Sequence, residues 1–168
     1  VGTGRSGEDV STVASFRIPG LDVQRIAIIT STGRPTHALY LGGNLDNANG
    51  NLKTDGSVYI SGNYNGNNGY MTIKGKLKIG GNMDLPSGNP QTIDSNTWIG
   101  GYLNVNSGNR LRYKMNLGVG GGLCKMNDSL VVDSSLNIYG SCPTGLDWRS
   151  EKKIRVNGRQ FFLRDQVL

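Results

Sequence analysis

Apolar and polar residues alternate in short phrases that recur through the middle of the chain. Apolar residues at every second position are typical of a β-strand with one buried face. Each phrase closes on a glycine, and the intervals between these glycines are 19, 19, 20, 20 and 19 residues. The glycine column is Gly43, Gly62, Gly81, Gly101, Gly121 and Gly140. A fixed period of this length indicates a stacked repeat.

Three apolar columns appear when the chain is aligned on these glycines. Four residues before each glycine stand Leu39, Val58, Leu77, Thr97, Leu117 and Leu136; two before stand Leu41, Ile60, Ile79, Ile99, Val119 and Ile138; two after stand Leu45, Tyr64, Met83, Leu103, Leu123 and Cys142. No single repeat can bury its apolar face alone, but coils stacked about 4.8 Å apart can. The sequence therefore predicts an all-β fold, a parallel β-solenoid of about six coils. We expect the glycine on the inward face, where each coil bends.

The chain divides into three expected parts. Residues 1–36 are expected to form a linker or stalk and an N-terminal capping strand, residues 37–142 the solenoid, and residues 143–168 a C-terminal cap. An open solenoid end exposes unpaired strand backbone, so both ends need a cover. The strand around Arg25–Thr30 is expected to cover the first coil.

The expected C-terminal cap is a β-hairpin. KKIRVNGRQFFL places Asn157 and Gly158 where a type I′ turn needs them. Its expected lid residues are Trp148, Phe161 and Phe162. Because the chain begins at Val1 rather than at Met, we expect it to be part of a longer protein.

Composition and charge limit the choice of function. The chain has 26 glycines and only 36% apolar residues, which suits a narrow core. Its net charge of +6 favours phosphate-bearing partners such as lipopolysaccharide; the alternative is ordinary solvated Lys and Arg. The sole histidine, His37, has no evident nucleophile and acid beside it, and no two acids share a column. The sequence therefore predicts no enzyme activity, no metal site and no cofactor.

Basic residues give the candidate binding sites. Two sets of basic residues alternate with apolar residues, so each set would project from one face of the solenoid. The first set is Lys74, Lys76 and Lys78, and the second is Arg110, Arg112 and Lys114. The expected cap adds the candidates Trp148, Arg149, Lys152, Arg155 and Arg159. Lys53 belongs near the same turn region. The two sets could line a positive stripe that binds anions or sugar phosphates. Nucleic acid is disfavoured because no aromatic stacking platform accompanies them. Solubility and edge protection are the competing interpretation.

Two cysteines lie close to one repeat apart. Cys124 and Cys142 are 18 residues apart, so they should lie on neighbouring coils, within the separation that a disulfide accepts. Their columns differ by one position, which a turn would have to absorb. The spacing favours a disulfide in an exported protein; the alternative is two buried free thiols.

Three stretches together resemble one known family. They are FRIPGLDVQR, ALYLGGNLDNANG and the ending Cys124…Asp133…Cys142-Pro-Thr-Gly-Leu-Asp-Trp148. The first two are similar to the Pro-Gly segment and the Gly-Gly-Asn entry into repeats of the shufflon-type minor pilins, the adhesins of conjugative type IV pili. The third resembles the Cys…Asp…Cys-x-x-Gly-x-Trp ending of that family. The resemblance covers residues 16–52 and 124–148.

That resemblance implies an extracellular protein of the pilus tip that recognises lipopolysaccharide or another surface glycan. It also implies a Cys124–Cys142 disulfide and partners among an upstream pilin region and other pilus subunits. A homotrimer is one possible assembly, because glycine-rich repeats also occur in trimeric fibres. The main alternative is a purely structural solenoid, either a bactofilin-like polymer or a phage tail-fibre segment. A third is a carbohydrate-active solenoid enzyme.

Overall fold

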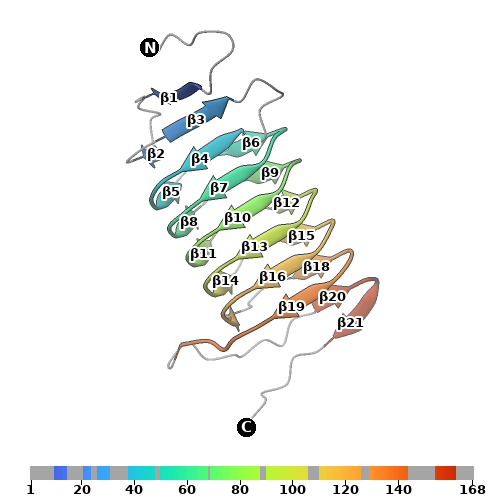
Figure 1. Cartoon of the computed structure of the whole chain (residues 1–168). Helices are drawn as coiled ribbons and strands as arrows, with labels where there is room; N and C mark the ends of the chain where they lie inside the picture. Colours follow the sequence, from blue (N-terminus) through green and yellow to red (C-terminus); the bar gives the residue numbers. More distant parts are fainter. Residues whose placement is uncertain are drawn as a thin grey trace.

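The protein is an all-β, parallel β-solenoid, which confirms the predicted fold class. The computed structural model describes residues 10–14, 21–23, 26–30, 38–47, 50–67, 69–87, 90–105, 110–125, 129–143 and 154–161. The strands β4 to β19 stack as successive rungs along one axis (Figure 1). Within these residues there is no helix that could cross a membrane.

Three sheets form the faces of the solenoid. Sheet A contains β1 (Val10–Ala14), β3 (Ile26–Thr30), β4 (Leu39–Leu41), β7 (Val58–Ile60), β10 (Leu77–Ile79), β13 (Thr97–Ile99), β16 (Leu117–Val119) and β19 (Leu136–Ile138). Sheet B contains β2 (Leu21–Val23), β5 (Leu45–Asn47), β8 (Tyr64–Asn67), β11 (Met83–Ser87), β14 (Leu103–Val105) and β17 (Leu123–Cys124). Sheet C contains β6 (Leu52–Thr54), β9 (Met71–Ile73), β12 (Gln91–Ile93), β15 (Leu111–Tyr113), β18 (Leu130–Val132), β20 (Ile154–Val156) and β21 (Arg159–Phe161).

The coil count is lower than the expected six. From β4 to β18, five coils each give one strand to every sheet. A further strand, β19, joins sheet A alone, because the chain forms no strand over residues 139–143 that follow it. Successive coils pair in parallel and in the register that the glycine alignment predicts, for example Ile79 with Ile99.

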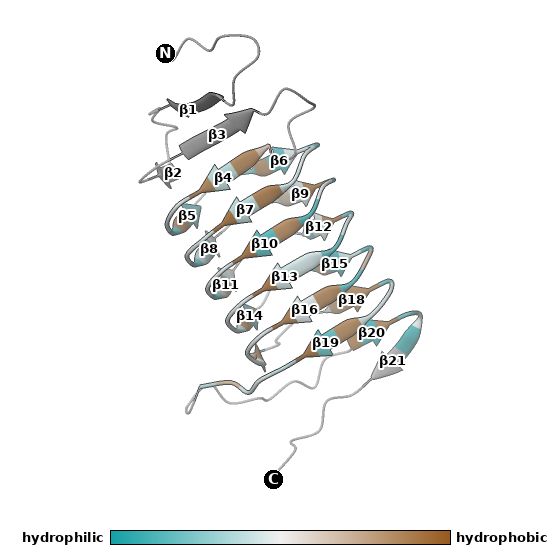
Figure 2. Ribbon diagram, in the orientation of Figure 1, coloured by the Kyte–Doolittle hydropathy of each residue, from teal (hydrophilic) through white to brown (hydrophobic). Residues whose placement is uncertain are grey.

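The core is a set of inward columns. In most strands the first and third side chains are buried, while the middle one faces outward, so hydropathy alternates along the strands (Figure 2). Leu and β-branched Ile and Val dominate the inward positions, as suits a pleated, packed surface. Two tyrosines, Tyr64 and Tyr113, are also buried in the core, and burial raises the pKa of both phenols.

Thr97 is a polar exception in an otherwise apolar column. Its side chain is 4% exposed, and its Oγ1 has no hydrogen-bond partner among the described residues. A buried hydroxyl without a partner costs about 1–3 kcal/mol. We therefore expect Thr97→Val to raise the free energy of unfolding by about 1 kcal/mol, measured by urea denaturation. Thr72→Val, on the outer side of β9, is the control and should change stability by less than about 0.5 kcal/mol; a destabilised Thr97→Val protein would contradict this account.

The glycine column lies at the corner between sheets A and B. The glycines are partly or fully exposed rather than buried, so the expectation of an inward position is wrong. Their backbones bond from coil to coil, as in Gly101 N–H to Gly81 O at 2.8 Å. None of these glycines has a positive φ, so the corner selects glycine for space and not for backbone conformation.

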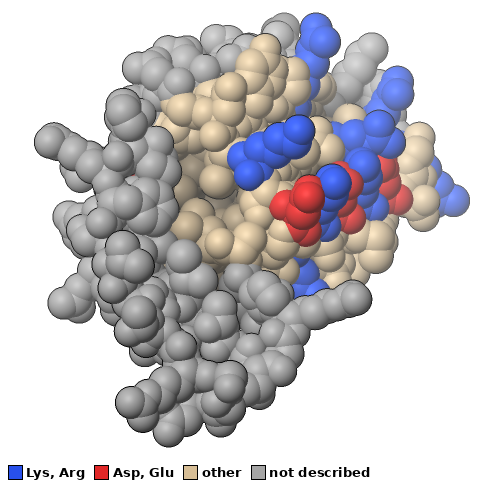
Figure 3. Space-filling view, turned by 90° about the horizontal axis from the view of Figure 1, so that it is seen from above, with Lys and Arg blue, Asp and Glu red and all other residues tan. Residues whose placement is uncertain are grey.

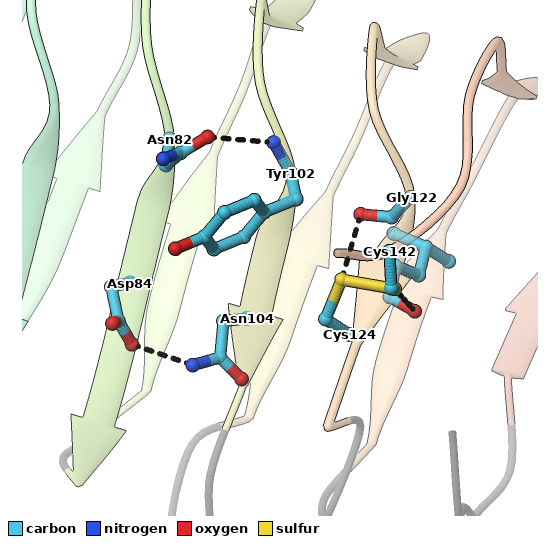
Figure 4. Close-up of a disulfide and its surroundings, with 8 residues drawn as sticks. Asn82, Asp84, Tyr102, Asn104, Gly122, Cys124 and Cys142 are labelled. Atoms are coloured by element: carbon cyan, nitrogen blue, oxygen red, sulfur yellow. Dashed lines mark hydrogen bonds between the residues drawn. A yellow bond between two sulfur atoms is a disulfide. The ribbon is translucent and has the colours of Figure 1, made fainter. Parts of the chain in front are cut away.

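An asparagine ladder fills the space that the glycine column leaves. It consists of Asn44, Asn63 and Asn82, and each side-chain oxygen accepts a hydrogen bond from the backbone N–H one coil further on, at 2.8, 2.8 and 3.0 Å. A β-carbon on Gly101 would collide with Oδ1 of Asn82 and lie 3.1 Å from its backbone nitrogen. The bond from Tyr102 N–H to Asn82 is drawn in Figure 4.

Both ends of the stack carry antiparallel strands. At the first coil, β3 pairs with β4, β1 pairs with β3, and β2 pairs with β5. Residues 10–14, which lie in the segment expected as a linker, thus form β1. At the other end β20 extends sheet C beside β18 and turns back into β21. Asn157 and Gly158 have φ values of 47° and 72°, as the predicted type I′ turn requires. Trp148 and Phe162 lie outside the described residues.

The predicted disulfide between Cys124 and Cys142 is present, with a Cα–Cα distance of 5.7 Å. Cys124 ends β17, the last strand of sheet B, and Cys142 lies in the segment that leaves the stack after β19 (Figure 4). The absence of a side chain on Gly122 leaves room for it, because a β-carbon there would lie 2.9 Å from Sγ of Cys142. The departing segment absorbs the one-position offset between the two columns.

Candidate functional site

The predicted basic stripe divides among three parts of the surface. Lys74 and Lys114 belong to a charge ladder at the corner between sheets C and A, which runs Asp55, Lys74, Asp94, Lys114 and Asp133. Ion pairs of 2.8 Å join Lys74 to Asp55 and Lys114 to Asp94. Red and blue side chains accordingly lie close together on one side of the described surface in Figure 3.

The charge ladder is neutralised by its own members. The hydrogen bond and charge of Lys74 lower the pKa of Asp55, and the same contact raises the pKa of Lys74. Both side chains are largely exposed, so the pair adds little stability. Three acids share this column, so the expectation that no two acids share one is wrong. Alternation of sign leaves no net positive strip along this corner.

The remaining candidates lie on two different sheets. Lys53, Arg112 and Arg155 occupy the outward middle positions of β6, β15 and β20 in sheet C, and Arg112 is paired with Asp133 at 3.0 Å. Arg110 precedes β15 and Arg159 opens β21, both exposed. Lys76 and Lys78 lie at sheet A. Trp148, Arg149 and Lys152 are outside the described residues.

Sheet A carries an aromatic face that the sequence analysis missed. The middle positions of its solenoid strands form an outer column, namely Tyr40, Tyr59, Lys78, Trp98, Gly118 and Asn137. These residues stand three before each glycine of the repeat, so the signal was present in the alignment. The premise that no aromatic platform accompanies the lysines is wrong.

The N-terminal half of the outer column is a stack of rings closed by a cation. The rings of Tyr40 and Tyr59 lie 4.7 Å apart at an interplanar angle of 19°. Nζ of Lys78 lies 5.4 Å from the centre of the Tyr59 ring, a favourable cation–π geometry. The rings of Tyr40 and Tyr59 therefore cover each other on one face, and Lys78 lies against the ring of Tyr59.

The C-terminal half of the outer column is a single open ring. The indole of Trp98 covers Gly118, since a β-carbon on that glycine would lie 2.6 Å from Cε3 and 2.9 Å from Cζ3 of the ring. Gly118 is accordingly buried although it faces outward. Trp98 remains 38% exposed, and the 69% exposed Tyr139 lies beside it, with ring centres 5.7 Å apart and planes tilted by 55°. The Trp98 indole thus forms a flat apolar surface, and the tilted ring of Tyr139 borders it on one side.

Polar side chains border this face on one side. The flanking column, one residue before each strand of sheet A, is Ala38, Ser57, Lys76, Asn96, Asn116 and Ser135. Oδ1 of Asn96 accepts from Asn116 N–H at 3.2 Å, and Oδ1 of Asn116 accepts from Ser134 and Ser135. Because the oxygens are engaged, the amide NH₂ groups are the polar atoms left toward solvent.

Aromatic, amide and ammonium groups together can stack against a ring and donate hydrogen bonds to its substituents. The described residues contain no group of His, Cys, Asp and Glu that could hold a metal ion. Neither the outer nor the flanking column contains an acid, a histidine or a cysteine. No family model, curated protein or solved structure matches this chain.

Proposed function

We propose that this protein is a non-enzymatic surface adhesin that binds a glycan on the outer face of sheet A. The observation that carries the proposal is the Trp98 indole seated over Gly118 with Tyr139 beside it. One face of a pyranose ring presents C–H groups, which pack on an aromatic ring much as apolar side chains do. Amides that border such a ring fix the orientation of the sugar hydroxyls.

The shape of the face favours a chain-like ligand. Successive coils repeat every 4.8 Å or so, and the outer and flanking columns carry charged residues at one level of the face only, at Lys76 and Lys78. A glycan held on such a surface stays solvated along one side. This suits adhesion, where many weak contacts add together.

The same proposal extends to location and target. A disulfide persists in an oxidising compartment, which agrees with an extracellular protein. The resemblance to pilus adhesins supports a pilus tip as the carrier and lipopolysaccharide on a target cell as the glycan source. A self-stacking structural polymer is less well supported, because antiparallel strands occupy the first coil and a hairpin extends the last part of sheet C.

Replacement of Trp98 tests this function. We expect Trp98→Ala to weaken binding to immobilised lipopolysaccharide or to a responding glycan at least tenfold, or about 1.4 kcal/mol, measured by surface plasmon resonance. Gly118→Ala keeps the indole, but the new β-carbon would displace the indole from its position over residue 118. This variant should also weaken binding.

Two matched variants serve as controls. Tyr70→Ala removes a 50% exposed aromatic residue that lies outside sheet A, and Gly42→Ala adds a β-carbon where nothing lies within 4 Å. Both should bind as the unmodified protein does. Full binding by Trp98→Ala, with an unchanged circular dichroism spectrum, would rule out this face as the glycan site.

A further inference from the structure

Lys76 and Lys78 place two positive charges at one level of the aromatic face of sheet A. Lys76 directly precedes the short strand β10, in the flanking column, and Lys78 is the middle residue of that strand, in the outer column. No carboxylate among the described residues forms an ion pair with either ammonium group. The acids of the charge ladder are bonded to basic residues of neighbouring coils. Within the described part of the chain, no acid is therefore paired with this positive charge.

The amides beside these lysines add further donors. Backbone or hydroxyl donors of the next coil bond to the oxygens of Asn96 and Asn116, which fixes the orientation of both amides. Their NH₂ groups continue the row of donors that begins at Lys76. A row of ammonium and amide donors without an acid selects a ligand that presents oxygen acceptors, and charged acceptors most strongly.

Lys78 and Trp98 are direct neighbours in the outer column. The lysine leans on the ring of Tyr59, and the indole extends over Gly118 in the opposite direction. The cation and the stacking platform thus lie on adjacent coils and extend away from each other along the axis. In a glycan chain that runs along the coils, a sugar unit on the indole would place a neighbouring unit beside the two lysines.

We infer that the ligand is an acidic glycan chain, in which a carboxylate or phosphate on one unit binds Lys76 and Lys78 while the pyranose ring of another unit stacks on Trp98. This inference rests on the proposed glycan-binding function and adds the charge of the ligand to it. Single-stranded nucleic acid is less well suited. Its phosphates need cations along the whole path, whereas both lysines lie in one coil, and Trp98 is the only member of the outer column with an open ring.

The experiment compares charged and neutral forms of the same sugar. Isothermal titration calorimetry on the full chain would use oligogalacturonate against its methyl ester, and phosphomannan against its dephosphorylated form. We expect at least one acidic form to bind roughly tenfold more tightly than its neutral partner, as charge-assisted hydrogen bonds imply. Added salt should weaken only the acidic form. Preference for oligogalacturonate assigns a carboxylate, and preference for phosphomannan assigns a phosphate.

Two variants tie this preference to the lysines. The double variant Lys76→Gln/Lys78→Gln should lose the preference but keep the affinity for the neutral sugar, whereas Lys53→Gln on sheet C should keep both. Equal binding of acidic and neutral sugars by the unmodified protein, or a preference that survives the double variant, would overturn the inference and leave the glycan-binding function intact. Absence of binding to every sugar would remove both. Tighter binding of a thymidine oligonucleotide through Lys76 and Lys78 would overturn it in favour of nucleic acid.

Discussion

Gly101→Ala is expected to lower the free energy of unfolding by about 3 kcal/mol, because it combines a steric clash with a lost hydrogen bond. The new β-carbon would collide with Oδ1 of Asn82 and lie 2.9 Å from its Cγ. Displacement of that side chain would leave Tyr102 N–H without the acceptor that it has at 3.0 Å. Urea denaturation, followed by circular dichroism, gives the measurement.

A double-mutant cycle separates the two causes. Asn82→Ala alone removes the hydrogen bond but leaves the space, so it should cost about 1 kcal/mol. Addition of Gly101→Ala to that variant should then cost much less than it does alone. Gly42→Ala, whose new β-carbon meets nothing within 4 Å, is the matched control and should be nearly neutral. Equal costs for Gly42→Ala and Gly101→Ala would show that the asparagine ladder is not what selects glycine.

Opening the Cys124–Cys142 disulfide is expected to cost about 3 kcal/mol, the value usual for a loop of this length. The two cysteines are 18 residues apart, and the cross-link holds the segment that leaves the stack against the last strand of sheet B. Urea denaturation with and without dithiothreitol measures the difference. Glycan binding should fall as well, because Tyr139 lies three residues before Cys142 and depends on the same segment for its place beside Trp98.

The variant Cys124→Ala/Cys142→Ala provides the control for this result. Without reductant it should be as unstable as the reduced protein, and dithiothreitol should not change it further. A difference below about 1 kcal/mol between oxidised and reduced protein would contradict the expected role, because chain-entropy arguments predict more for such a loop.

The inward columns, the hairpin and the disulfide could be predicted from the sequence because each depends on local spacing. Period-two alternation placed Leu77 and Ile79 in the core, and Asn157-Gly158 placed the turn. The surface could not be predicted in the same way. Lys74, Lys76 and Lys78 alternate as if on one strand, but the chain turns a corner around Gly75, so Lys74 joins the charge ladder and Lys78 the aromatic face.

The aromatic face also depends on contacts that spacing does not reveal. Trp98 and Tyr139 stand at different positions of the repeat, and they meet because the chain leaves the stack after β19. The seat of the indole on Gly118 is visible only once the strands are in register. The coil count was too high for a related reason: the last phrase of the repeat supplies β19 but no strand in sheet B.

The outer column has a consequence for how this protein can change over time. Its side chains do not take part in the glycine corner, the asparagine ladder or the buried columns, so replacing one of them leaves the scaffold intact. Apart from Gly118, which lies under the Trp98 indole, each coil therefore offers one variable position at a fixed height above the same sheet. Divergent sequences could thus share one rod while differing in what they recognise, and a shift in specificity needs only a few substitutions along a single line.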